Sequence, residues 1–83
     1  TAKEVLWAEK YYVQKEDMGK IIYIDQRMLD AGVDDKEAMR LHMNMAVVYA
    51  KLGKKEKAIE HAQAIARLDP AQKEAVDNFI NAL

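Results

Sequence analysis

The chain contains no cysteine, and it has only one proline and three glycines among its 83 residues. The absence of cysteine excludes a disulfide framework and any metal site built from thiolates. The scarcity of proline and glycine excludes collagen-like and low-complexity composition, and it favours helices with few breaks. No apolar run is long enough to span a bilayer, so membrane insertion is not expected.

The sequence also lacks an excess of charge of either sign, with 13 basic and 14 acidic residues and a net charge of −1. This balance creates no global field that would gather nucleic acid, so a nucleic-acid partner is not expected. Apolar residues make up 51 % of the chain, which is too many for a disordered tail and enough for a small core. We therefore expect a single small helical domain.

Apolar residues recur every three or four positions along most of the chain, which predicts about five helices. We expect them over residues 2–15, 20–31, 35–52, 54–68 and 71–82. The stretch 15–19 is expected to be a turn, because it interrupts the apolar stripe and ends at a glycine. Two further turns are expected at Gly32 and Gly53, since glycine adopts a left-handed backbone without steric cost.

Local signals define several details of these helices. Asp34 or Asp35 can cap the third helix, and Asp69-Pro70 should end the fourth, because proline disfavours helical geometry in the residue before it. The residues of the second helix expected to face inward are Ile21, Ile22, Met28 and Leu29. The polar side of the last helix, expected to face water, comprises Gln72, Lys73, Asp77, Asn78 and Asn81.

Residues 39–70 carry small, aromatic and turn-forming residues at a particular spacing. The set consists of Met45, Ala46, Tyr49, Gly53, Ala58 and Asp69-Pro70. This spacing resembles the tetratricopeptide repeat, a helical hairpin of about 34 residues. In such a hairpin, the small side chains of Ala46 and Ala58 would let two helices approach closely. His42 stands where the family usually has tryptophan, so packing is its expected role.

Residues 2–36 resemble a degenerate copy of the same repeat. Tyr12 aligns with Tyr49, but Ile21 replaces the small alanine and the closing proline is absent. Residues 71–83 fit either a terminal capping helix or the first helix of a third repeat. The resemblance therefore implies an all-α domain of antiparallel helical hairpins, stacked as a short right-handed solenoid.

No catalytic or cofactor motif is recognisable in the sequence. There is no HExxH pattern, no glycine-rich phosphate loop and no EF-hand spacing of aspartates. His42 and His61 lie in different expected helices and have no convincing pattern of acidic partners. We therefore predict that the chain is not an enzyme and holds neither a cofactor nor a metal ion.

A tetratricopeptide array lines its inner surface with the first helix of each hairpin. The alignment places there Lys3, Leu6, Lys10, Val13, Arg40, Met43, Val47 and Lys51. These residues mix apolar and basic character, which suits a peptide with apolar anchors and acidic flanks. Met43 and Val47 replace polar residues of the family's carboxylate clamp, so a receptor for a terminal carboxylate is not expected.

The resulting prediction is a non-catalytic protein–protein interaction module that binds a peptide or partner segment in this inner groove. One alternative stays open, in which the chain self-associates as a homo-oligomer or as the stacking segment of a longer array. Another is a recruiting tail of a larger envelope or secretion protein. In a further interpretation, the inner-face residues are ordinary side chains on a scaffold surface.

Overall fold

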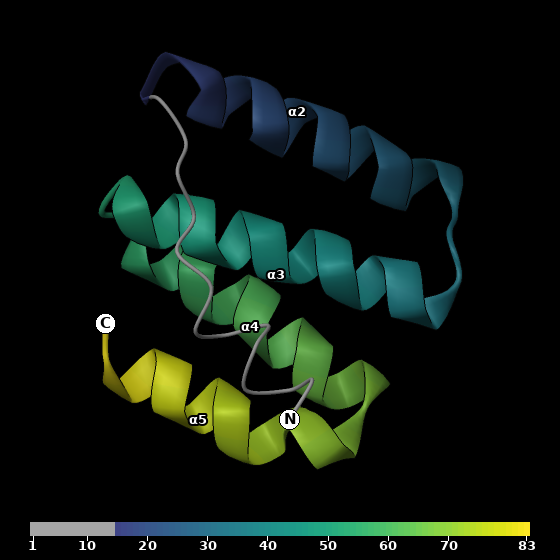
Figure 1. Ribbon diagram of the computed structural model, residues 1–83, viewed down its shortest axis with the longest axis vertical. Helices are drawn as coiled ribbons and strands as arrows, with labels where there is room; N and C mark the ends of the chain where they lie inside the picture. The colour runs from purple at the N-terminus through teal and green to yellow at the C-terminus, as the bar shows by residue number, and fades with distance from the viewer. Residues whose placement is uncertain (1–14) are drawn as a thin grey trace.

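The computed structural model describes residues 15–83, which are helical apart from short connections (Figure 1). The elements are α2 (Lys15–Ala31), α3 (Asp35–Lys51), α4 (Lys55–Leu68), the 3₁₀ helix η1 (Pro70–Gln72) and α5 (Lys73–Asn81). Within residues 15–83 there is no strand, so the expected all-α class is confirmed. The helix expected over residues 2–15 lies almost entirely outside the described residues.

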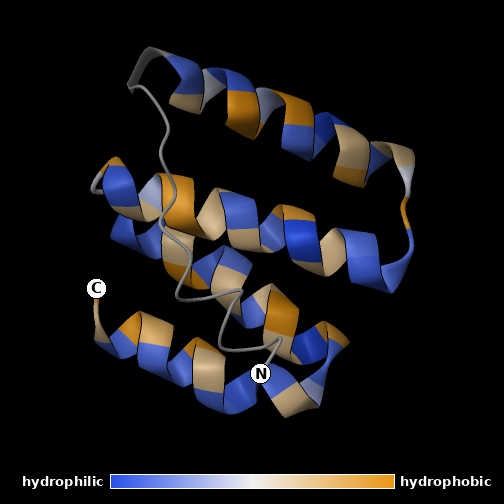
Figure 2. Ribbon diagram, viewed as in Figure 1, coloured by the Kyte–Doolittle hydropathy of each residue, from blue (hydrophilic) through white to orange (hydrophobic). Residues whose placement is uncertain are grey.

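Each helix packs against the next one along the chain. α2 lies beside α3, α3 packs against α4, and α4 contacts both η1 and α5 (Figure 1). The connections are only a few residues long, and such connections make neighbouring helices antiparallel. Figure 2 shows polar and apolar residues alternating around each helix, as expected for helices that bury one face and expose the other.

Glycines form the two turns at which the chain reverses between long helices. Gly32 has a φ of 94° and Gly53 a φ of 76°, both in the left-handed region that glycine tolerates best. The Gly32 N–H donates to the Leu29 carbonyl at 3.1 Å, and the Gly53 N–H donates to the Ala50 carbonyl at 3.1 Å. Both expected turns are therefore confirmed.

The turn expected over residues 15–19 is wrong, because α2 runs through this stretch without a break. A glycine inside a helix costs only about 1 kcal/mol relative to alanine, and packing readily overrides that cost. Packing is present here, since the side chain of Met18, directly before Gly19, is only 8 % exposed. The apolar face of α2 therefore begins before the glycine.

The buried face of α2 also differs from the expected one. Asp25 is buried, with 8 % of its surface exposed, whereas Met28 is 38 % exposed. Met18, Ile22 and Asp25 follow the spacing of one helical face, and Ile22 is partly buried. Because α2 turns this face toward its neighbours, the expectation that Met28 points inward is wrong.

The centre of the core lies between α3 and α4. The fully buried residues of these two helices are Leu41, Met45, Ala46, Val48, Ala58 and Ala62. The burial of Ala46 and Ala58 is what the close approach of two helices requires. On the side of α5, Val76 packs into a cluster with Met43 and Ile65.

Asp69 forms the joint between α4 and η1. Its N–H donates to the Ile65 carbonyl at 2.9 Å, and its carboxylate accepts from the Ala71 N–H at 3.1 Å. The expected end of the fourth helix at Asp69-Pro70 is therefore confirmed. The expectation that Gln72 faces water is wrong, because its side chain folds back onto Asp69, at 3.4 Å, and is 7 % exposed.

Candidate functional site

The side of α3 that faces η1 and α5 carries two pockets. The first pocket, of about 440 Å³, lies at the start of α3 and is lined by Asp34, Lys36, Glu37, Met39, Arg40, Met43, Ile65 and Gln72. The second pocket, of about 460 Å³, lies at the end of α3 and is lined by Val47, Ala50, Lys51, Gly53, Lys55, Phe79, Ala82 and Leu83. Together they follow most of the length of this helix.

The structure distributes the described part of the expected inner face between these pockets. Arg40 and Met43 line the first pocket, and Val47 and Lys51 line the second. The four residues are spaced by three or four positions, so they share one face of α3. The other expected residues lie outside the described ones; these are Lys3, Leu6, Lys10 and Val13.

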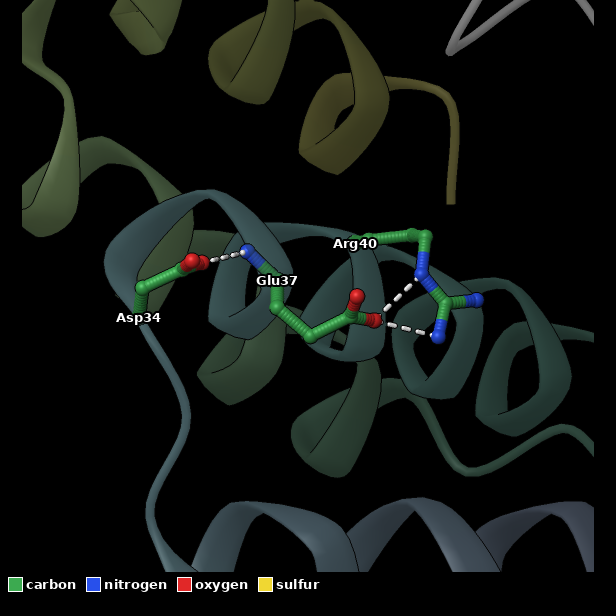
Figure 3. Close-up of polar contacts among 3 residues, drawn as sticks. All are labelled: Asp34, Glu37 and Arg40. Carbon is green, nitrogen blue, oxygen red and sulfur yellow. Dashed lines mark hydrogen bonds and ion pairs between the residues drawn. The ribbon is translucent and has the colours of Figure 1, made fainter.

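Capping of α3 organises the polar rim of the first pocket (Figure 3). Asp34 Oδ1 accepts a hydrogen bond from the Glu37 N–H at 2.8 Å, which confirms the expected N-cap. Glu37 Oε1 in turn accepts from Nε of Arg40 and forms an ion pair with its Nη2. Arg40 is thus held by a carboxylate of its own helix, and the first pocket presents balanced charge.

Met43 is a core residue as well as a wall of the first pocket. Its side chain is 9 % exposed and belongs to the cluster that contains Ile65 and Val76. The sequence analysis placed Met43 on the inner face; the structure places it in the lining of the first pocket, where packing with Ile65 and Val76 leaves it largely buried. Met43 therefore supplies an apolar floor for the pocket.

The second pocket combines apolar walls with unneutralised positive charge. Val47, Phe79 and Leu83 come together from α3 and the end of the chain. Lys51 and Lys55 are both exposed, and neither forms an ion pair with any residue in the described part of the chain. This pocket is therefore suited to an apolar group that carries a negative charge beside it.

The structure brings His42 and His61 together, although 19 residues separate them. Their Nδ1 atoms are 2.9 Å apart, and the His61 ring also stacks on Tyr49 with a centroid distance of 5.6 Å and an angle of 9°. Sequence reasoning missed this arrangement. The spacing of seven residues between His42 and Tyr49 could have indicated it, because this spacing places both on one face of α3. That face packs against α4, the helix that carries His61.

Burial lowers the pKa of both histidines. The pKa of His42 is lowered further by Arg67, and that of His61 by the neighbouring His42 and by Lys57, while Glu60 acts in the opposite direction. Both rings are therefore neutral near pH 7. One Nδ1 can then donate a hydrogen bond while the other accepts it.

Asp25 is a buried acid at the contact between α2 and α3. Its Oδ2 atom has no hydrogen-bond partner among the described residues. Burial raises the pKa of this carboxyl, and the nearby Arg40 and Asn44 partly offset the shift. Keeping Asp25 ionised in this buried position therefore destabilises the folded chain, and Arg40 and Asn44 offset only part of this destabilisation.

Searches for a metal cluster and a membrane-spanning helix in the described residues, and for similar known proteins, identify no further feature of this chain. Within residues 15–83, no group of three or more histidine, aspartate or glutamate side chains lies close enough together to hold a metal ion. None of the helices described for this chain has both the length and the apolar character needed to cross a membrane. Comparison with protein-family models, curated proteins and solved structures finds no match to this chain.

Proposed function

We propose that the chain is a non-catalytic protein–protein interaction module whose α3 face binds a peptide or a partner segment. The observation that carries this proposal is the succession of two pockets along one helix face, from Arg40 to Lys51. These residues are separated by roughly 16 Å along the helix axis. An extended segment of about five residues covers that length.

The chemistry of the pockets defines the kind of segment that fits. An apolar side chain would cover the floor formed by Met43 in the first pocket, and a second one would lie against Val47 in the second. An acidic group near the second anchor would meet Lys51 and Lys55, and this charge complementarity would speed association and select the orientation. The resemblance of residues 39–70 to a tetratricopeptide hairpin supports the same face.

The capped ends of α3 favour binding without rearrangement. Asp34 fixes the start of the helix, and the left-handed Gly53 fixes its end. A surface held in this way loses little conformational freedom when a partner binds, so more of the contact energy contributes to affinity. As part of the same proposal, the helical hairpins stack as a short right-handed solenoid, to which further repeats of a longer array would add.

The test is selection of peptides from a displayed random library against the whole chain, followed by binding measurements with the selected peptides. Val47→Glu and Lys51→Glu should each weaken binding at least about tenfold, equal to about 1.4 kcal/mol. Lys20→Glu makes the same charge change as Lys51→Glu, on the exposed side of α2, and serves as its matched control. Equal affinities for all three variants, with helicity intact, would contradict the proposal.

A second candidate function is self-association through α2. Two large apolar side chains lie side by side on the exposed surface of this helix: Tyr23 is 62 % exposed and Ile24 is 54 % exposed. Neighbouring exposed apolar side chains of this kind are typical of surfaces that bind another protein. Arg27 covers one side of Tyr23, with its guanidinium 5.5 Å from the ring centroid. Sedimentation over a range of concentrations should show a larger apparent mass at high concentration, and Ile24→Lys should abolish the change.

A further inference from the structure

The histidine pair is the one group of metal-ligating side chains that the proposed function leaves unused in the part of the chain that the structure describes. His42 comes from α3 and His61 from α4, so the pair lies across the contact between the two central helices. The same atom of each ring, Nδ1, points toward the other at 2.9 Å. Two neutral imidazoles placed in this way offer two nitrogen ligands from separate helices.

The distance between the two nitrogens is close to what a metal ion requires. Zinc bonds to histidine nitrogen at about 2.0–2.1 Å, so two ligands in tetrahedral geometry lie about 3.4 Å apart. The observed separation of 2.9 Å needs to widen by only about 0.5 Å. We take this movement to come from small rotations of the two side chains, whose ring planes are inclined by 37°.

Tyr49 orients one of the two rings, and both histidines are only partly buried. Tyr49 stacks on His61 at an interplanar angle of 9° and thereby fixes the orientation of that ring. Outer contacts of this kind orient the ligands of metal sites. The proposal requires water at the coordination positions that the protein does not fill, and the partial exposure of both histidines is compatible with this.

The charges that face the pair are mixed. Lys57 and Arg67 oppose a cation, whereas Glu60, next to His61 in the chain, favours one. Because the site is half exposed, solvent and salt screen the opposing charges. Burial and the two cations also keep the rings unprotonated, and only an unprotonated nitrogen can bind a metal ion.

We infer that His42 and His61 form a binding site for one divalent transition-metal ion, completed by water and connecting α3 to α4. Imidazole nitrogen suits zinc, copper and nickel, and among these zinc adopts the tetrahedral geometry used above. The bound ion would take the place of the hydrogen bond between the rings, and the ring that donates it would then carry its proton on Nε2. It would fasten the helical hairpin whose α3 face carries the two pockets.

The experiment is titration of the tag-free chain with zinc chloride, followed by calorimetry and by NMR of the histidine side chains. We expect saturable binding of one ion per chain, with movement of both ring signals. His42→Gln and His61→Gln should each weaken binding at least about tenfold. Tyr49→Phe keeps the stacked ring and is the matched control, and it should bind zinc as the original chain does.

Two results would overturn the inference. One is the absence of any movement of the two histidine ring signals at millimolar zinc, which would leave a hydrogen-bonded pair only. The other is unchanged zinc affinity in both glutamine variants, which would place the ion elsewhere. Circular dichroism of each variant verifies folding, and the NMR measurement on the unaltered chain decides the question even where a variant does not fold.

Discussion

Replacing Ala58 with leucine measures how closely α3 and α4 approach each other. Ala58 is fully buried where these two helices pack. Leucine adds three carbon atoms, and burying them would stabilise the fold by about 0.8 kcal/mol each if space were free. In a filled core, the added atoms instead force side chains and backbone to shift, at a cost of about 1–3 kcal/mol.

The assay is thermal and urea unfolding followed by circular dichroism. For a domain of this size, a loss of about 2 kcal/mol lowers Tm by roughly 8–16 °C. Ala31→Leu is the matched control, because Ala31 is exposed at the end of α2 and should tolerate the same added atoms. If Ala58→Leu were as stable as the original chain, the two helices would not be in close contact there, and our account of the core would be refuted.

Three further substitutions test local features by the same unfolding assay. Asp34→Ala removes the cap of α3 and should destabilise the chain by about 1 kcal/mol, and an unchanged midpoint would mean that the cap contributes nothing. Gly53→Ala meets no steric clash but forces a side chain into the left-handed region, so we expect a loss of about 1–2 kcal/mol, which equal stability would contradict. For Asp25, burial holds the pKa in the folded chain above the ordinary 3.8, so the folded state takes up a proton first. The contribution of Asp25 to stability should therefore grow as pH falls from neutral toward 3.8, and Asp25→Asn should remove this part of the pH dependence. Identical pH profiles for the two chains would show that Asp25 is not desolvated.

Features set by neighbours in the sequence were predictable. The cap at Asp34, the turns at Gly32 and Gly53, and the stop at Asp69 each depend on a residue and the backbone groups within a few positions of it. The apolar face of α3 was predictable for a similar reason. Apolar residues that recur every three or four positions lie on one face of a helix, whatever packs against that face.

Features set by tertiary packing were not predictable. Gly19 looked like a turn because its cost to a helix is visible in the sequence, while the compensating burial of Met18 is not. The burial of Met43 depends on Val76 of α5, which nothing in the sequence of α3 reveals. The meeting of His42 and His61 depends on the rotation of two helices about their axes, which spacing within one helix does not determine.

The joint at Asp69 has a consequence for the edge of the first pocket. Its carboxylate holds the Ala71 N–H and the side chain of Gln72, which itself lines the first pocket. One short acidic side chain thus holds the start of the turn out of α4, while Val76 of α5 packs into the core cluster. Replacing Asp69 with alanine would remove the hydrogen bonds to Ala71 and Gln72 and so free the Gln72 side chain at the edge of the first pocket. The edge of this pocket can therefore be altered at one position without any change in the residues packed between α3 and α4.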